Sequence, residues 1–183
     1  MTSIYEIDWR LNSTERILAN LGNAITDLVQ ELDELDEQYQ IDDTLELIEN
    51  CLGIAFVIAQ HYIIGTVSDA NRIIKSHNIL TKESLLRMCD DRISSSEITR
   101  MELCDAMANY YKHHEEWGKW AEAGRHQRTV SVLNSAGIKE KDIFPCGEAF
   151  ALLWPGARES NLNPFVQLIT SWRARVIDTC AQK

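Results

Sequence analysis

Residues 45–67, LELIENCLGIAFVIAQHYIIGTV, form the most apolar stretch of the chain and decide its fold class. The apolar side chains recur with the spacing of a helix, at Leu45, Ile48, Leu52, Ala55, Ala59 and Tyr62. The pattern continues to about Ser76, which predicts a helix of more than 30 residues. Residues 51–67 reach the short limit for a membrane span, but they contain Gln60 and His61. We therefore expect a helix buried in a bundle or a dimer, and no membrane insertion. The excess of apolar surface over residues 45–67 predicts that the protein is a homodimer.

A partner helix is predicted before this stretch, from about Asn12. Its apolar positions are spaced by three and four residues, at Leu21, Ile25, Leu28, Leu32, Leu35 and Tyr39. Asn12 with Glu15, and Asp43 with Glu46, have the spacing of capping boxes, and Gln38–Asp42 is the predicted turn. Two consecutive helices with a short link predict a long N-terminal antiparallel hairpin.

Further helices are predicted along the rest of the chain, where no segment shows convincing strand alternation. The expected ranges are about 81–90, 94–114, 126–136 and 147–153, followed by a last helix that begins at Asn163-Pro164. Ser94 with Glu97 predicts a third capping box, and Gly137 predicts the end of a helix. Because we find no internal repeat and no linker, we predict one all-α helical bundle over residues 1–183.

The composition is that of a soluble globular domain. Of 183 residues, 45% are hydrophobic and 25% are charged. The five cysteines lie far apart and show no Cys/His ligand spacing, so we expect no disulfide framework, no metal site and no cofactor. The first residues have neither the basic nor the apolar region of a signal peptide, and we expect a cytoplasmic protein.

The negative charge is concentrated near the N-terminus. The net charge is −10, and residues 1–50 alone carry 13 acidic and two basic side chains. Such a surface repels phosphate, so we do not expect this part to bind nucleic acid. It is either a solvated face of the hairpin or a surface for a basic protein partner. The candidate partner-binding residues are Asp33, Glu34, Asp36 and Glu37.

Residues 108–120, ANYYKHHEEWGKW, carry the clearest indication of a functional site. Asp105, Asn109 and His113 are spaced by four residues and therefore share one face of a helix, with Lys112 on the same side. This stripe is either a solvated face with ion pairs or the lining of a polar cleft. The medium reach of its side chains and the aromatic residues around it favour the cleft.

The spacing Asn-x-x-x-His in an all-α chain resembles the HEPN superfamily of prokaryotic helical domains, many of them homodimers. The usual motif of this family is Arg, a polar residue, three residues and His. Asn109 and His113 match it, whereas Ala108 stands at the arginine position. The resemblance implies a role in toxin–antitoxin or antiviral defence systems, often as a metal-independent endoribonuclease. It makes His113 the general base, with Asn109 as its orienting residue and either Lys112 or Arg125 as the source of positive charge.

Arg125, His126 and Arg128 form the densest basic patch. They either bind phosphate near a helix N-terminus or simply begin a surface helix. If this patch folds back on the Asn109–His113 face, the two together form an RNA-facing surface. We expect the neighbouring tryptophans and His61 to belong to the core rather than to a site, Trp117 and Trp120 by packing and His61 by hydrogen bonding.

Two functions remain open. The first is an HEPN-like component of a bacterial toxin–antitoxin or anti-phage defence system that acts through protein–protein interaction, because the missing arginine and the net charge oppose RNA cleavage. The second is a divergent metal-independent endoribonuclease with His113 as general base. Arg72 and His77 match a looser form of the motif, in which four to six residues separate Arg from His, but chance alone accounts for such a match.

Overall fold

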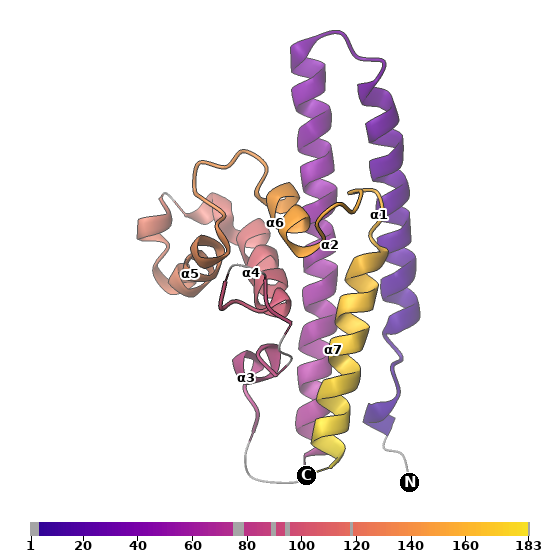
Figure 1. The fold of residues 1–183 in the computed structure, drawn as a ribbon, viewed down its shortest axis with the longest axis vertical. Coiled ribbons are helices and arrows are strands. Elements are labelled where there is room, and N and C mark those ends of the chain that lie inside the picture. Colours follow the sequence, from indigo (N-terminus) through magenta and orange to yellow (C-terminus); the bar gives the residue numbers. More distant parts are fainter. Residues whose placement is uncertain (1–3, 75–78, 89–90, 94–95, 118, 183) are drawn as a thin grey trace.

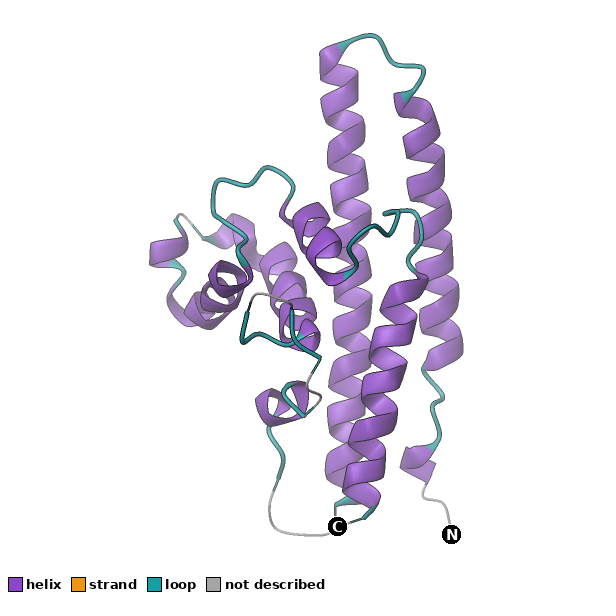
Figure 2. Ribbon diagram, in the orientation of Figure 1, coloured by secondary structure: helices purple, strands orange, loops and turns teal. Residues whose placement is uncertain are grey.

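The computed structural model describes residues 4–74, 79–88, 91–93, 96–117 and 119–182. Helices and one isolated bridge are the regular structure that these residues form, which confirms the predicted all-α class (Figure 2). The α-helices are α1 (Leu11–Leu32), α2 (Gln38–Ile73), α3 (Lys82–Leu86), α4 (Arg100–His113), α5 (Gln127–Ala136), α6 (Pro145–Leu153) and α7 (Asn163–Ala181). The short 3₁₀ helices are η1 (Ile4–Glu6), η2 (His114–Glu116), η3 (Trp120–Glu122) and η4 (Gly124–His126).

The central element of the fold is α2, which α1, α4, α6 and α7 all contact (Figure 1). α1 and α2 lie side by side and run in opposite directions, and residues 33–37 join them at one end. That end projects beyond the other helices, whereas α7 packs along the opposite half of the pair. The predicted seam of α2 lies in the core, since Ile48, Leu52 and Tyr62 are buried.

The predicted ends of the first two helices are wrong. α1 stops at Leu32, so Leu35 and Tyr39 are not part of it. α2 begins at Gln38, inside the predicted turn at Gln38–Asp42. Neither helix has a side-chain cap at its first residue, and the predicted capping pairs of Asn12 and Asp43 lie within helices. Packing of the apolar stripe stabilises helical turns beyond the local capping signals.

The later helices follow the predicted order with shifted starts. The helix expected from Ser94 begins at Arg100, where Thr99 and Glu102 form the capping box, while Ser94 lies outside the described residues. His77 lies outside them as well. Gly137 ends α5 as predicted, with a φ of 99° that favours glycine.

The start of α6 is set by a side chain from another helix. The helix expected over 147–153 begins at Pro145, because the carboxylate of Glu49 on α2 accepts hydrogen bonds from the backbone N–H groups of Cys146 and Gly147, at 2.6 and 2.9 Å. A carboxylate at this end of a helix satisfies N–H groups that have no partner within the helix.

α2 has the length and composition of a membrane span, with a mean hydropathy of 1.6 over 18 residues, but half of that window is buried against the rest of the chain. The core helix of a bundle has this kind of burial, so the length and composition of α2 are weak evidence for a membrane span. Of the apolar stretch that predicts a dimer, Leu52, Phe56 and Ile63 are buried within the single chain, whereas Leu47, Ile54 and Ile64 stay exposed. The prediction of a buried His61 is wrong, because this side chain lies on the exposed face of α2.

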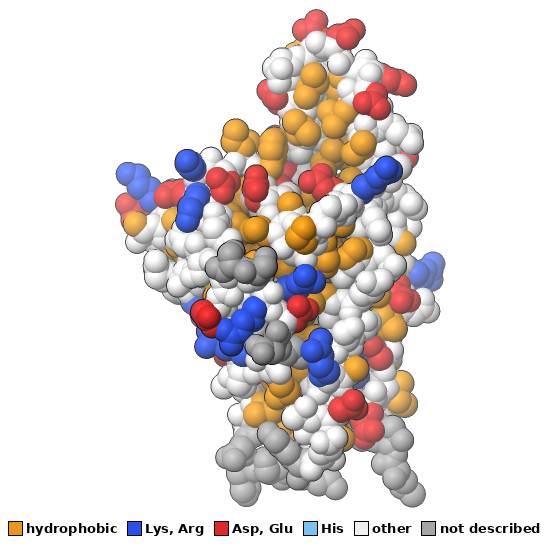
Figure 3. Space-filling model, viewed as in Figure 1, with side chains coloured by type: hydrophobic (Ala, Val, Ile, Leu, Met, Phe, Trp, Pro, Cys, Tyr) orange, Lys and Arg blue, Asp and Glu red, His pale blue; other side chains and the backbone are white. Residues whose placement is uncertain are grey.

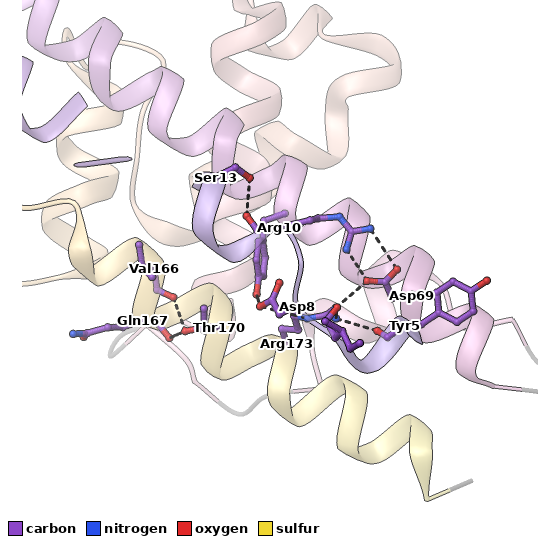
Figure 4. Close-up of polar contacts among 11 residues, drawn as sticks. Tyr5, Asp8, Arg10, Ser13, Asp69, Val166, Gln167, Thr170 and Arg173 are labelled. Carbon is purple, nitrogen blue, oxygen red and sulfur yellow. Dashed lines mark hydrogen bonds and ion pairs between the residues drawn. The ribbon is translucent and has the colours of Figure 1, made fainter. Parts of the chain in front are cut away.

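A buried ion network joins the two ends of the chain to α2 (Figure 4). Asp69 of α2 accepts hydrogen bonds from Arg10 and Arg173, with the closest nitrogens at 2.6 and 3.1 Å. Arg173 of α7 also lies 3.5 Å from Asp8 and donates to the backbone carbonyl of Tyr5. The network thus fixes the segment before α1 against α2 and α7.

Candidate functional site

A polar cleft of about 220 Å³ lies between α3, α4 and α5. Asp105, Asn109 and His113 line it from α4, as the cleft interpretation of the polar stripe predicts. The opposite wall contains the predicted basic patch, Arg125, His126 and Arg128. Two segments that the sequence singles out separately therefore meet in one place, which we call the α4–α5 cleft.

The buried face of α4 aims the polar stripe at this cleft. Met101, Cys104 and Ala108 lie in the core. Ala108 is completely buried, so the position where the HEPN motif has arginine faces the interior and not the cleft. An arginine at position 108 would therefore start from the core side of α4. The basic residues that line the cleft belong to other segments.

His113 is held by Glu116, three residues beyond the end of α4. The Nδ1 atom of His113 lies 3.0 Å from Oε1 of Glu116, and this contact lowers the pKa of the Glu116 carboxyl. A carboxylate on one imidazole nitrogen fixes the ring and leaves the other nitrogen available as a proton acceptor. This role of Glu116 is missing from the sequence prediction, although its three-residue distance from His113 could have suggested it.

A second imidazole packs against the first. The ring of His126 lies with its centroid 4.9 Å from that of His113 and 5.3 Å from that of Trp117. Trp117 and Trp120 are buried and both pack edge-on against Tyr110, which agrees with their predicted place in the core. This aromatic packing positions the loop that carries the basic patch.

Arg125 contacts His126 and Glu116, the partner of His113. Its Nε donates a hydrogen bond of 2.9 Å to Nε2 of His126, and its Nη2 lies 3.5 Å from Oε2 of Glu116. Partial burial, followed by the charges of Arg125 and His113, lowers the pKa of His126 below its ordinary value. The Arg125 side chain is 78% exposed, so it can move to a ligand without disrupting the core.

Asn109 and Lys112 contact a buried glutamine rather than His113. Gln60 of α2 donates to the side-chain oxygens of Asn109 and Asp105, at 2.9 and 2.8 Å. Its own oxygen accepts a hydrogen bond of 2.6 Å from Lys112, whose pKa is lowered by burial. Lys112 does not line the cleft, and the orienting contact on His113 comes from Glu116 instead of Asn109.

Most basic side chains of the cleft already have acidic partners. Lys82 lies 2.8 Å from Asp105, and Arg128 lies 2.8 Å from Glu83. The contact of Arg125 with Glu116 is longer, at 3.5 Å. Of these three cations, Arg125 therefore loses the weakest ion pair when it turns to a bound anion.

The predicted partner-binding residues gather at the projecting end of the hairpin. Asp33, Glu34, Asp36 and Glu37 are all exposed, and they make no ion pair within the part of the chain that the structure describes. We call these four residues the acidic tip. In the space-filling view, acidic side chains lie at this end of the molecule, and apolar side chains lie below them (Figure 3). Val29, Tyr39 and Leu47 are exposed apolar residues of the same two helices.

A group of metal-ligating side chains lies at the α4–α5 cleft, which His113 and His126 line, although the sequence predicts no metal site. One ligand atom each from His113, Glu116 and His126 lies within 4.8 Å of the other two. His126 is 13 residues from His113 and ten from Glu116, so no compact spacing of the kind seen in zinc motifs marks the group.

Comparison of the chain with protein-family models, with curated proteins and with solved structures gives no match.

Proposed function

We propose that the α4–α5 cleft binds an RNA phosphodiester and cleaves it without a metal ion, with His113 as general base. The observation that carries this proposal is the convergence of two imidazoles and an exposed guanidinium from segments 113–116 and 125–126. General acid–base chemistry at neutral pH uses such a pair of titratable groups, and a cation stabilises the negative charge that develops on the oxygens bound to phosphorus.

The proposed reaction gives His113, His126 and Arg125 one role each. His113, held through Nδ1 by Glu116, accepts the proton of the ribose 2′-hydroxyl at Nε2. The 2′-oxygen then bonds to phosphorus and the bond from phosphorus to the 5′-oxygen breaks, which leaves a 2′,3′-cyclic phosphate. His126 in its protonated form donates a proton to the leaving 5′-oxygen. Arg125 turns from His126 to the phosphate and stabilises the negative charge of the transition state.

The test is incubation of the purified protein with total RNA in EDTA, beside the His113→Ala and His126→Ala variants. We expect cleavage by the wild type and a loss of roughly 10²- to 10⁴-fold in each variant, the usual contribution of a general acid or base. His61→Ala is the matched control, because His61 is exposed on α2 and does not line the cleft. Undiminished cleavage by folded His113→Ala protein contradicts the proposal.

A second function is favoured by the acidic tip. Its four carboxylates are exposed and form no ion pair with the residues that the structure describes. They lie at the projecting end of the hairpin and form a surface for a basic protein. Such a partner agrees with the toxin–antitoxin role that the HEPN resemblance implies. A second copy of the chain carries the same negative charge and would be repelled at this tip.

The partner hypothesis is tested by reversing the charge of all four residues of the acidic tip and measuring the affinity for a basic protein that co-purifies with the wild type. We expect weaker binding at low salt and a smaller dependence of affinity on salt. The control reverses four exposed acidic residues elsewhere, Glu115, Glu122, Glu148 and Asp178. Equal affinity of wild type and tip variant at low salt removes the hypothesis.

A further inference from the structure

We propose that His113, Glu116 and His126 bind one divalent transition-metal ion of the zinc class. Their ligand atoms lie within 4.8 Å of one another, and His113 Nδ1 is already 3.0 Å from Glu116 Oε1. Imidazole nitrogen and carboxylate oxygen bind zinc at about 2.0–2.2 Å, so two ligands of one tetrahedral ion stand roughly 3.4 Å apart. The cluster reaches this geometry through small side-chain rotations.

The side chains of the cluster have room for these rotations. His113 ends α4, Glu116 ends η2 and His126 ends η4, so none is locked in the middle of a helix. Glu116 is exposed and the two imidazoles are half-buried. The packing of His126 against Trp117 meanwhile holds the second imidazole beside the first. The packing thus orders His126 before the ion binds, and the exposed Glu116 side chain can rotate to complete the site.

A cation already contacts two of the three ligands. The Arg125 guanidinium donates to Nε2 of His126 and lies 3.5 Å from Oε2 of Glu116. This contact shows that the lone pair of His126 and the charge of Glu116 face a position that accepts positive charge. Because Arg125 is mostly exposed, a metal ion can displace it into solvent. The guanidinium and the metal ion therefore compete for the same ligands.

Three protein ligands leave one position of a tetrahedral ion open, as in catalytic zinc sites. The bound ion would take the Glu116 carboxylate away from His113 and would coordinate both imidazoles that the proposed cleavage reaction uses. Metal binding is thus expected to inhibit RNA cleavage, and this consequence rests on the proposed function. The metal site itself does not depend on that function.

The test is titration of EDTA-stripped and dialysed protein with Zn²⁺ by calorimetry at pH 7.5, and with Co²⁺ by visible absorption. We expect one ion per chain and the absorption bands of a four- or five-coordinate Co²⁺ site with nitrogen and oxygen ligands. His113→Ala and His126→Ala should each weaken binding at least about tenfold, and Glu116→Gln should weaken it as well. The matched controls, His61→Ala and Glu115→Gln, change exposed residues outside the cluster and should bind like the wild type.

Arg125→Ala should have the opposite effect to the histidine and Glu116 variants. Removal of the guanidinium abolishes both competition for His126 and repulsion of the ion, so this variant should bind Zn²⁺ more tightly than the wild type. The proposal is overturned if the wild type takes up no ion, if both histidine variants bind like the wild type, or if Arg125→Ala binds more weakly. The titration is independent of RNA, so ion binding without RNA cleavage refutes only the proposed function, and cleavage without ion binding refutes only the metal site.

Discussion

Arg173 of α7 and Asp69 of α2 form an ion pair at 3.1 Å in which both side chains are almost completely buried. Arg10 contacts the same carboxylate at 2.6 Å, so one negative charge holds two guanidinium groups from opposite ends of the chain. The close approach of Arg10 also explains Gly65, because a side chain there would overlap the guanidinium. α4, which lines the α4–α5 cleft, packs on the α2 helix that this network anchors.

Asp69→Asn should strongly destabilise the protein. The substitution leaves two buried guanidinium groups near an uncharged amide, and breaking a buried ion pair typically costs about 3–5 kcal/mol. Urea unfolding followed by circular dichroism measures the change. Asp43→Asn is the control on the same helix, since Asp43 is exposed and should change stability by no more than about 0.5 kcal/mol. A loss below about 1 kcal/mol in Asp69→Asn would show that the network contributes little.

Gly53→Ala should also destabilise the protein, although alanine favours helices more than glycine. The ring of Tyr111 from α4 packs directly on Gly53, and an added methyl group would overlap the ring. Overpacking of this kind costs about 1–3 kcal/mol. In a Tyr111→Ala background the ring is gone, so the same substitution should stabilise by up to about 1 kcal/mol. Thermal unfolding of the wild type, the two single variants and the double variant tests this reversal of sign. Equal effects of Gly53→Ala in both backgrounds would exclude the contact with the Tyr111 ring as the cause.

The helical class and the order of the helices could be predicted because they depend on periodic apolar positions. The ends of the helices could not, because residues distant in sequence determine them. Glu49 caps α6 across nearly 100 residues, and Thr99 rather than Ser94 caps α4. His61 shows the same limit, since an apolar neighbourhood in sequence does not tell which face of α2 is covered.

Glu49 should make the protein less stable as pH rises above 4.5. Burial raises its pKa above that ordinary value in spite of two backbone hydrogen bonds, and the pKa of Glu159 is raised by burial and by the charge of Glu49. Between pH 4.5 and the raised value, the folded protein binds more protons than the unfolded chain, so the stability from these groups is lost as pH rises.

The comparison of wild type with Glu49→Gln isolates this effect. We expect the stability of the wild type relative to the variant to fall as pH rises from 4.5, and to be independent of pH well below it. Urea unfolding at a series of pH values measures the difference, and Glu46→Gln provides an exposed control on α2. A wild type that gains stability over the variant with rising pH would contradict the assignment.

The part of the candidate site that lies on one helix could be predicted from the sequence. The spacing of Asp105, Asn109 and His113 places them on one face of α4, and the structure turns that face to a cleft. The partners of these residues come from other elements. Gln60 of α2 holds Asn109, and the pairing of His113 with His126 depends on how the chain folds back between α4 and α5.

Thr99→Ala should destabilise the helix that carries this site. The Thr99 hydroxyl accepts from the backbone N–H of Glu102, whose carboxylate accepts in return from the backbone N–H of Thr99, each at 3.1 Å. Loss of such a cap costs about 0.5–2 kcal/mol. Thr99→Ser keeps the hydroxyl and should retain most of that stability. Urea unfolding measures the global loss, and amide hydrogen exchange should show faster opening of residues 100–103 in the alanine variant. Similar exchange in the alanine and serine variants would mean that packing, and not the cap, holds the start of α4.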